Sequence, residues 1–418
     1  MTHFGIICPA AAGHLNPMIT LGCELQQRGH RVTVINIEDA RAKTEAAELE
    51  FQAIAKAKYP LGYTKELFTK FGSAKGIRAI KLTIDLIANG AKIFLTHAPE
   101  LVKSSGIEAL LVDQGSAEGG TIAEHLDIPF ISLCSAIILN EDITVPPYIA
   151  TWNYDPSWRG ILRNRLGYAL ISFGRKPLLQ VINNYRRQWN LPPCSNMDET
   201  YSKLAQISQQ PVEFEFPRKN IPPVFHFAGS FNNPRSREPV SFPYEKLTRQ
   251  PLIYASMGTI QNQLLWIFEM IAEACTNIDA QLVIALGGGL NPESLTQLKA
   301  KENTIVVGYA PQLELLQKAD LTITHAGMNT TLESLSNGVP MVAIPITNDQ
   351  PGVAARIAWT GTGEVISLNK VSLKKLRKAI EKVLNDNSYK NNALKLQQAI
   401  KKAGGVKGAA DLIEQVVT

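Results

Sequence analysis

Polar side chains recur at fixed distances within the otherwise apolar segment 309–350, which reads YAPQLELLQKADLTITHAGMNTTLESLSNGVPMVAIPITNDQ. Its apolar run 321–324 predicts a buried strand, and Gly327 with Asn329 opens a helical pattern. His325 is therefore expected at a strand-to-helix turn, where open α/β sheets bind ligands. A helix that begins near Asn329 directs free N–H groups and the positive end of its dipole at that turn. The segment therefore predicts a diphosphate-binding site.

This segment resembles the donor signature of the UDP-dependent glycosyltransferases that consist of two Rossmann-like domains. The resemblance assigns a donor-binding role to each matching position. Tyr309 would stack on the base, Gln312 would contact base or ribose, His325, Gly327, Asn329 and Thr330 would surround the diphosphate, Glu333 would hold the ribose hydroxyls, and Asp349 and Gln350 would hold the hexose.

The plant members of the family have tryptophan where this chain has Tyr309, which leaves the preference for a base open. Glu333 favours UDP over dTDP, because a carboxylate can accept hydrogen bonds from both hydroxyls of a ribose. Taken one by one, these residues also fit an ordinary β-turn-α connection. Their joint spacing is specific for donor binding.

Two further glycine-containing turns precede this segment. Ser256 and Gly258, in the sequence ASMGT, resemble the second phosphate contact of the family, although an ordinary turn explains them equally well. The glycine run 287–289 fits either a close approach of backbone to the nucleotide or a tight left-handed turn.

His14 and Asp113 are the predicted catalytic residues. His14 lies in the loop AAGHLN after the first predicted strand, and Asp113 ends the predicted strand 109–113. At the carboxyl edge of one sheet, the imidazole can deprotonate an acceptor hydroxyl while the carboxylate orients the ring. The family resemblance implies the same two roles. Taken alone, His14 also fits a turn residue and Asp113 a helix cap.

Direct attack by a hydroxyl would invert the anomeric carbon and turn an α-linked UDP-sugar into a β-glycoside. The departing diphosphate then needs hydrogen-bond donors or positive charge. The sequence contains no Asp-x-Asp triplet and no cluster of metal ligands. We therefore expect no metal ion and no cofactor, the UDP-sugar being itself a substrate. His325 and the helix that follows it are expected to stabilise the leaving group.

Length and composition are typical of a two-domain globular protein. A chain of 418 residues exceeds what one core usually organises. The formal net charge of +5 is too small to indicate nucleic-acid binding. Five cysteines without metal or disulfide spacing favour a reducing, cytoplasmic compartment. No run of eighteen apolar residues predicts a membrane span, and the N-terminus reads as a strand rather than a signal peptide.

Strands alternate with helices in both halves of the chain, which predicts an α/β fold of two doubly wound Rossmann-like domains facing a cleft. Residues 1–231 form the predicted acceptor domain, 232–250 the linker and 251–390 the nucleotide-sugar domain. By the resemblance, the helical tail 391–418 crosses back to the first domain. Near the N-terminus a helix is expected from Pro17 to about Arg28, with Asn16 as its N-cap.

The acceptor has no recognisable motif. Residues 158–189 interleave apolar and aromatic side chains with arginine and lysine, a pattern compatible with peripheral contact to an anionic membrane. A helical hairpin with a core face and a solvated basic face is the alternative, and the pattern favours it slightly. The short form HAGMNTT resembles bacterial members that glucosylate zeaxanthin-like carotenoids. Both observations favour a lipophilic alcohol or phenol.

These observations predict an inverting, metal-independent UDP-dependent hexosyltransferase, with glucose as the favoured sugar. A UDP-sugar epimerase of the same fold and a non-catalytic nucleotide-sugar-binding subunit are the alternatives. The epimerase would isomerise the donor in the absence of any acceptor. The joint presence of His14 and Asp113 disfavours the non-catalytic subunit. No GxGxxG follows a strand with an acidic residue behind it, which disfavours an NAD-dependent oxidoreductase.

Overall fold

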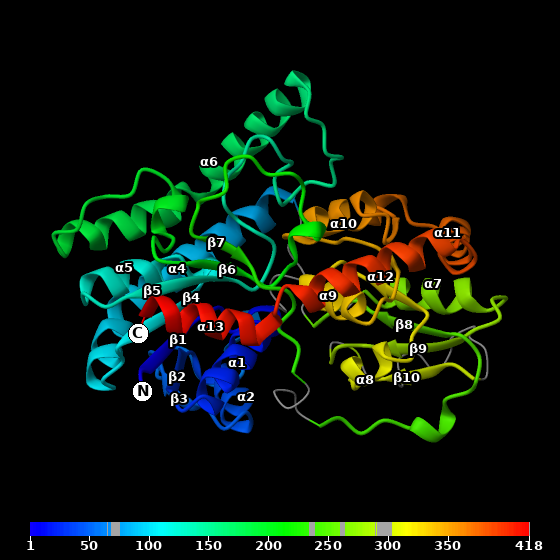
Figure 1. Ribbon diagram of the computed structural model, residues 1–418, viewed down its shortest axis with the longest axis horizontal. Coiled ribbons are helices and arrows are strands. Elements are labelled where there is room, and N and C mark those ends of the chain that lie inside the picture. Colours follow the sequence, from blue (N-terminus) through cyan, green and yellow to red (C-terminus); the bar gives the residue numbers. More distant parts are fainter. Residues whose placement is uncertain are drawn as a thin grey trace.

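Two α/β domains lie side by side in the protein (Figure 1). The computed structural model describes residues 1–64, 66–67, 76–233, 239–259, 264–288, 290 and 303–417. Residues 234–238 of the predicted linker and Gly289 of the glycine run lie outside these described ranges. The two parallel sheets confirm the predicted fold class.

The first domain contains a seven-stranded parallel sheet with the order β3-β2-β1-β4-β5-β6-β7. Its strands are β1 His3–Ile7, β2 Arg31–Asn36, β3 Glu50–Ala53, β4 Ala109–Asp113, β5 Phe130–Cys134, β6 Gln206–Ser208 and β7 Phe225–Phe227.

The second domain contains a six-stranded parallel sheet with the order β10-β9-β8-β11-β12-β13. Its strands are β8 Leu252–Ser256, β9 Gln281–Ala285, β10 Ile305–Val307, β11 Leu321–Thr324, β12 Met341–Ala343 and β13 Gly363–Val365.

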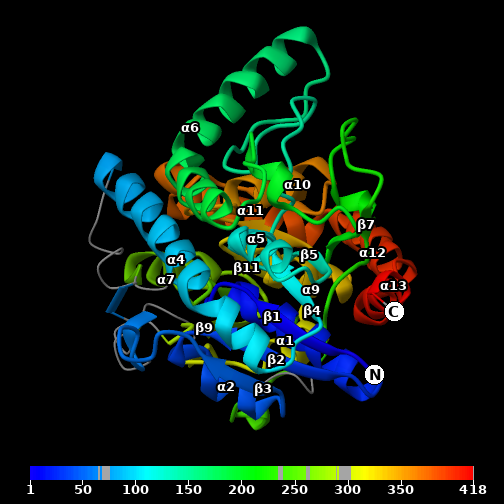
Figure 2. The ribbon, with the colours of Figure 1, turned by 90° about the vertical axis from the view of Figure 1, so that its left-hand side faces the viewer.

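Helices cover both faces of the two sheets (Figures 1 and 2). They are α1 Ala12–Gln27, α2 Arg41–Ala46, α4 Gly76–Ser104, α5 Glu118–His125, α6 Trp158–Gln188, α7 Leu265–Cys275, α8 Gln312–Leu316, α9 Met328–Ser336, α10 Gln350–Trp359, α11 Leu373–Asn385, α12 Asn387–Lys402 and α13 Gly405–Val417. Strands β1, β4, β5, β8 and β9 are buried along their whole length, as expected of parallel strands covered on both faces.

Each sheet reverses the direction of its strand order at one point, which is called its switch point. In the first sheet this point lies between β1 and β4, and in the second between β8 and β11. Ligands of open α/β sheets bind outside the carboxyl ends of the strands at such a point. The residues that follow these four strands are therefore the ones that the fold places at a binding site.

Helix α1 begins earlier than expected. The prediction of a helix start at Pro17 with Asn16 as the N-cap is wrong, because Ala11 occupies the N-cap position and Pro17 lies inside the helix. The tight turn after β1 goes directly into the helix, so His14 belongs to the first turn of α1 rather than to a loop. Pro17 has no N–H, so the carbonyl of Gly13 four residues earlier lacks its intrahelical partner.

The C-terminal segment forms two helices, whereas a single helical tail was expected over 391–418. Gly404 and Gly405 have positive φ values of 90° and 59°, and this left-handed pair ends α12 and redirects the chain. Helix α12 packs on α9 of the second domain, and α13 packs on α1 of the first. Figure 1 shows the red C-terminal helix lying over the first domain. Arg28, the C-cap residue of α1, pairs there with Asp411 and Glu414.

The sequence predicts free cysteines and no membrane-spanning segment. All five cysteines are buried and none forms a disulfide. Within the described ranges, no helix combines the length and the apolarity that are needed to cross a bilayer.

Candidate active site

His14 and Asp113 are in direct contact, although 98 residues separate them in the sequence between positions 14 and 113. His14 lies just after β1 and Asp113 ends the adjacent strand β4. Nδ1 of the imidazole lies 3.1 Å from each carboxylate oxygen. The backbone N–H of Gly115 donates to Oδ1 of Asp113 at 2.6 Å, so the carboxylate is held from two sides. The histidine side chain is 27% exposed and the aspartate 1%, so a buried carboxylate supports a partly exposed ring.

Electrostatics favour the protonated form of His14. Burial disfavours the imidazolium, but the Asp113 carboxylate outweighs this effect, and the pKa of His14 is raised above 6.5. Asp349 of the second domain adds a smaller attraction. Burial in turn raises the pKa of Asp349, while the charge of His14 opposes that rise. The two domains thus bring a residue predicted for the sugar within electrostatic reach of the predicted base.

His325 occupies the corresponding position in the second domain. It follows β11, next to Ser256 at the end of β8. Its Cε1 and Nε2 lie 2.6 Å from the positions that a Cβ would take at Gly258 and at Gly327, so only glycine leaves room for the ring. Burial lowers the pKa of His325 to about 4, which keeps the ring neutral near pH 7. Its Nδ1 is buried without a hydrogen-bond partner among the described residues.

Helix α9 starts directly behind this histidine. Ala326 adopts a left-handed conformation with φ 64°, which turns the chain from β11 into the helix and costs about 1–3 kcal/mol for a residue with a Cβ. Met328 begins the helix, and no side chain caps its N-terminus. The backbone bond from Thr331 to Gly327 is 3.0 Å long, so the N–H groups before Thr331 precede the helical ladder. This terminus can bind an anion through N–H groups and the helix dipole.

Gln312 organises a cluster of buried polar groups beside α9. Its Oε1 accepts a hydrogen bond from the Tyr254 hydroxyl at 3.0 Å, and its Nε2 donates to Thr330 at 3.3 Å and to the carboxylate of Glu333. Thr330 and Glu333 are both buried. Burial raises the pKa of Tyr254, and the negative charge of Glu333 adds to this effect. Three of the predicted donor-binding residues thus share one hydrogen-bond network.

Tyr309 lies at the edge of the second domain and remains 57% exposed. Its phenol ring lies against Gly288, where a Cβ would overlap the hydroxyl group. Gly287 and Gly288 have positive φ values of 64° and 75°, which is the left-handed turn that the sequence offered as one of two alternatives. An exposed ring held in this way is suited to stacking on a planar ligand.

Gln350 uses part of its side chain within its own loop. Its Oε1 accepts hydrogen bonds from the backbone N–H of Ile346 at 2.8 Å and of Thr347 at 3.0 Å. The amide oxygen therefore shapes the loop that carries Asp349. Only the NH₂ group of Gln350 is left by these bonds for a further contact.

Asn329 reaches across to the first domain. Its Nδ2 donates to the carbonyl of Gly13 at 3.0 Å, and its Oδ1 accepts from Nε2 of Gln209 at 2.8 Å. The Gly13 carbonyl is available because Pro17 cannot donate to it. Gln209 also donates to the carbonyl of Ser135, which follows β5. The residue predicted to bind the diphosphate therefore also joins the two switch points.

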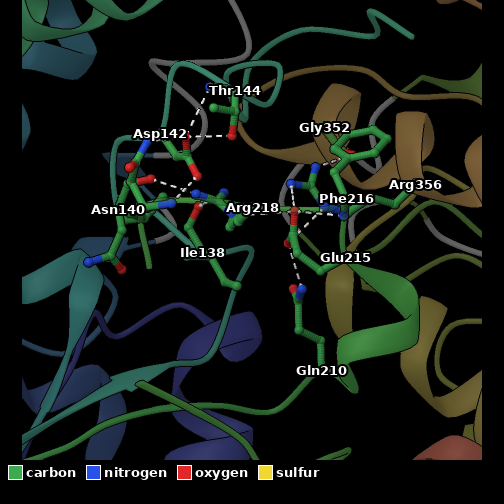
Figure 3. A network of polar contacts seen from close by, with 12 residues as sticks. Ile138, Asn140, Asp142, Thr144, Gln210, Glu215, Phe216, Arg218, Gly352 and Arg356 are labelled. Atoms are coloured by element: carbon green, nitrogen blue, oxygen red, sulfur yellow. Dashed lines mark hydrogen bonds and ion pairs between the residues drawn. The ribbon is translucent and has the colours of Figure 1, made fainter. Parts of the chain in front are cut away.

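A buried ion cluster joins α10 to the first domain (Figure 3). The fully buried Arg356 of α10 pairs with both carboxylate oxygens of Glu215, and Nε of Arg218 lies 3.3 Å from the same carboxylate. The Arg356 guanidinium also lies 4.5 Å from the centroid of the Phe216 ring. Because Gln350 begins α10, the cluster fixes the helix that positions the predicted sugar contacts.

Several of these residues were not found from the sequence. For Gly13 the sequence contained a usable signal, because Pro17 inside a helix leaves the Gly13 carbonyl without its intrahelical partner. The others have no spacing that relates them before the chain is folded. The residues that sequence reasoning missed are Gly13, Gln209, Glu215, Arg218, Tyr254 and Arg356.

In the part of the chain that the structure describes, no group of three or more histidine, cysteine, aspartate or glutamate residues could hold a metal ion. The groups gathered around α9 are an imidazole, amides, hydroxyls, the single carboxylate of Glu333 and a helix N-terminus.

The chain resembles solved glycosyltransferases over its whole length. The crystal structure of the glycotransferase of kitacinnamycin superposes with a TM-score of 0.77 at 21% identity, covering 100% of this chain and 99% of that one. The glycosyltransferase VinC in complex with dTDP superposes with a TM-score of 0.73 at 15% identity and covers 100% and 99% of the two chains. At these identities the likeness concerns the fold.

Relatives of known name are more similar in sequence. Zeaxanthin glucosyltransferase of Pantoea ananas is 31% identical over 417 residues, which is 100% of this chain and 96% of the relative. The NDP-glycosyltransferase YjiC of Bacillus subtilis is 28% identical and covers 99% of this chain and 96% of its own. The family model described as UDP-glucoronosyl and UDP-glucosyl transferase matches residues 6–407. The chain therefore belongs to the family of UDP-glucuronosyl and UDP-glucosyl transferases, and it is a UDP-dependent glycosyltransferase.

Proposed function

We propose that this enzyme transfers glucose from UDP-glucose to a hydroxyl of a lipophilic small molecule, with inversion and without a metal ion. One observation carries the proposal. The partly exposed ring of His14, backed by the buried Asp113, lies within electrostatic reach of Asp349 from the other domain. The proposed base on one domain thus interacts electrostatically with the carboxylate on the other domain that is proposed to bind the sugar.

His14 serves as the general base in this mechanism. Asp113 accepts the hydrogen bond from Nδ1, so the lone pair of the neutral ring is on Nε2. Nε2 removes the proton of the acceptor hydroxyl as its oxygen attacks the anomeric carbon from the side opposite the diphosphate. The buried Asp113 then stabilises the imidazolium that forms. A single displacement of this kind inverts the configuration of the sugar.

The leaving diphosphate is stabilised by the start of α9. The uncapped N-terminus of α9 offers backbone N–H groups, and the buried, neutral ring of His325 can donate one more hydrogen bond. Because these donors are fixed before the reaction, no metal ion is needed in the proposal. EDTA should leave turnover unchanged, and a loss that a divalent cation restores would contradict this part of the mechanism.

Glu333 selects the nucleotide. Its buried carboxylate is held by Gln312, and it can accept both hydroxyls of a ribose. Tyr309 provides an exposed ring on which the base can stack. The donor is therefore proposed to be UDP-glucose rather than a dTDP-sugar, with Asp349 and the NH₂ group of Gln350 on the hydroxyls of the hexose.

The acceptor is proposed from the relatives. Two relatives named zeaxanthin glucosyltransferase, from Pantoea ananas and Pseudescherichia vulneris, are each 31% identical over the whole of this chain. Their name supports glucose as the sugar and an apolar alcohol as the acceptor. The five free cysteines support a cytoplasmic location.

A mass-spectrometric screen tests the proposal directly. Purified enzyme is incubated with UDP-glucose, UDP-galactose, UDP-N-acetylglucosamine or dTDP-glucose, each with carotenoid diols, terpenoid alcohols and phenols. We expect a β-glucoside from UDP-glucose and an apolar alcohol. Transfer of another sugar at a higher rate would overturn the donor assignment. Conversion of UDP-glucose to an isomer without any acceptor would show an epimerase instead.

A further inference from the structure

Large apolar side chains lie exposed along one face of the first half of α6. Their exposed fractions run from 48% for Leu162 to 78% for Phe173, with Trp158, Leu166 and Leu170 in between. At 100° per residue these five positions fall within an arc of about 120°. Figures 1 and 2 show that α6 projects from the body of the molecule. The exposed apolar face of α6, defined by these five residues, is therefore accessible to a partner.

This face is not an extension of the hydrophobic core. The residues of the same half of α6 that are buried are Gly160, Asn164, Gly167, Tyr168 and Ile171. They centre about 160° around the helix from the exposed apolar face. The helix therefore has a complete packing face on one side and a second apolar face on the opposite side. A solvated helix face would carry polar side chains there.

Basic residues border the exposed apolar face on both sides. Arg163 and Arg165 fall about 20° outside the two edges of the face, Arg159 falls within its arc, and Lys176 continues one edge beyond Phe173. Neither aspartate nor glutamate occurs anywhere in α6. Two carboxylates from neighbouring segments lie near this half of the helix, because Asp155 attracts Arg159 and Arg163 and Glu141 accepts a hydrogen bond from Ser172. The side chains of α6 itself contribute only positive charge to the face.

The face is also hollowed. A groove of about 500 Å³ runs along it and is lined by Trp152, Trp158, Leu162, Leu166 and Leu170. The guanidinium of Arg163 lies 4.9 Å from the centroid of the Trp152 ring, which holds a cation beside the apolar lining. Large apolar patches of this kind on a protein surface mark interaction sites.

We propose that the exposed apolar face of α6 docks the enzyme onto the surface of an anionic lipid bilayer. The apolar side chains would enter the boundary between headgroups and acyl chains, and the bordering arginines would bind lipid phosphates. Tryptophan is enriched at this depth because its ring is apolar and its N–H is polar. Trp158 lies on this face, and Trp152 lines the groove beside it.

Charge favours a bilayer over a second copy of the chain as the occupant. A symmetric dimer through this face would pair it with itself, and the arginine borders of both copies would then meet. An anionic surface instead complements the apolar stripe and both basic borders. Docking would also hold the first domain against the phase in which a lipophilic acceptor dissolves.

Sedimentation with lipid vesicles tests the proposal. The full-length enzyme is mixed with vesicles of phosphatidylcholine alone or of phosphatidylcholine and phosphatidylglycerol in equal parts. We expect binding to the anionic vesicles, weak binding to the zwitterionic ones, and loss of binding as salt is raised. The double variant Leu166→Ser/Phe173→Ser should weaken binding about tenfold or more. The double variant Arg159→Gln/Arg165→Gln should weaken it about fivefold for each arginine.

Matched controls come from exposed residues of the second domain. Trp266→Ser/Leu394→Ser removes two exposed apolar side chains, and Arg249→Gln/Lys395→Gln removes two exposed charges. These controls should bind like the wild type. All variants should keep the wild-type melting temperature and the wild-type rate of transfer to a water-soluble phenol. This readout separates docking from folding and from the transferase activity.

Three results would overturn the proposal. One is the absence of binding to anionic vesicles. Another is an equal loss of binding in the control variants. The third is a concentration-dependent dimer, seen by analytical ultracentrifugation, that Leu166→Ser/Phe173→Ser abolishes while vesicle binding persists unchanged. The third result would assign the face to a second copy of the chain.

Discussion

The carboxylate of Asp113 combines two roles that the sequence offered as alternatives. It accepts a hydrogen bond from the Gly115 N–H and thereby caps the turn after β4, and it also contacts His14. The cap fixes the carboxylate, and the fixed carboxylate orients the imidazole. A residue that looks like an ordinary cap in sequence can therefore also belong to the proposed catalytic pair.

The pH dependence of transfer tests this pair. The base must be neutral, and the pKa of His14 is raised above 6.5, so kcat/KM should fall on acidification with an inflection above pH 6.5. Asp113→Asn removes the charge that raises this pKa and should move the inflection to lower pH. It should also lower the plateau about 10²–10⁴-fold, as should His14→Ala. Rates are measured with a phenol acceptor across the pH range.

Both variants should still bind UDP, which serves as the control for folding. An inflection that stays in place in Asp113→Asn would show that His14 is not the titrating base.

Glu333 is testable through ligand-induced stabilisation. UDP should raise the melting temperature of the wild type by mass action, and 2′-deoxy-UDP should raise it less. Glu333→Gln keeps the size of the buried side chain but removes the charge that accepts the ribose hydroxyls. The difference between the two nucleotides should then vanish. If the variant still distinguishes them, Glu333 does not read the ribose. The shift is measured by scanning fluorimetry at several nucleotide concentrations.

At the scale of single elements, the two switch points are built differently. In the second domain, glycines at 258 and 327 make room for His325, and α9 begins without a cap. In the first domain, a helix with an internal proline leaves a free carbonyl, and Asn329 binds it. Pro17 in α1 therefore leaves free the Gly13 carbonyl through which the two domains are in contact.

Pro17→Ala tests this account of α1. Proline inside a helix costs roughly 3 kcal/mol relative to alanine, so the variant should melt at a higher temperature. The new N–H would compete with Asn329 for the Gly13 carbonyl, and the KM for UDP-glucose should rise severalfold. Pro99, which also lies inside a helix, is the matched control. Pro99→Ala should raise the melting temperature without any change of KM. A Pro17→Ala enzyme with an unchanged KM would refute the proposed link.

At the scale of the whole molecule, three of the connections that the described residues make between the domains help to hold them together, and two of these three are polar. One is the hydrogen-bonded chain through Asn329, and the other is the buried cluster of Arg356, Glu215 and Arg218. The C-terminal helix α13 adds a third connection by packing on α1. Burial disfavours the charge of Glu215, but the two arginines outweigh this effect and lower its pKa below 4.5. The carboxylate is therefore charged in the folded protein at neutral pH.

Substitution of the carboxylate and substitution of one arginine of this cluster should lower the free energy of unfolding by unequal amounts. Glu215→Gln leaves two buried guanidinium groups without their nearest counter-charge and should cost about 3–5 kcal/mol in the free energy of unfolding. Arg356→Met should cost less, because Arg218 still neutralises Glu215. Lys382→Gln, in the exposed pair with Glu364, is the control and should cost less than about 1 kcal/mol. Urea unfolding measures all three.

The sign of the pH effect follows from the lowered pKa of Glu215. Its stabilising contribution is complete above about pH 4.5 and is lost as the pH falls through the folded-state value. The difference between the wild type and Glu215→Gln should therefore shrink in acid. Equal, small effects of both cluster variants at neutral pH would show that the cluster does not hold the domains.

Much of the donor domain could be predicted from the sequence because its chemistry is local. The strand 321–324, the turn at His325 and the helix behind it follow each other without interruption, so spacing alone relates their side chains. The pair of His14 and Asp113 was predictable for a different reason. Parallel strands end at the same edge of a sheet, and β1 and β4 are neighbours in the common order of this fold. Strand β6 escaped detection because two of its three residues, Gln206 and Ser208, are polar, so it shows no apolar run.

By itself, the sequence determined the two alternating α/β halves, the turns that can bind a diphosphate and the residues that can act as base and partner. These depend on local periodicity and on the rules of parallel sheets. Only the tertiary structure decided that Asn329 meets the Gly13 carbonyl, that Glu215 lies between two arginines, and that the apolar face of α6 is exposed. Those contacts join residues from different domains, or depend on which face of a helix the rest of the chain covers. No spacing along one chain encodes either property.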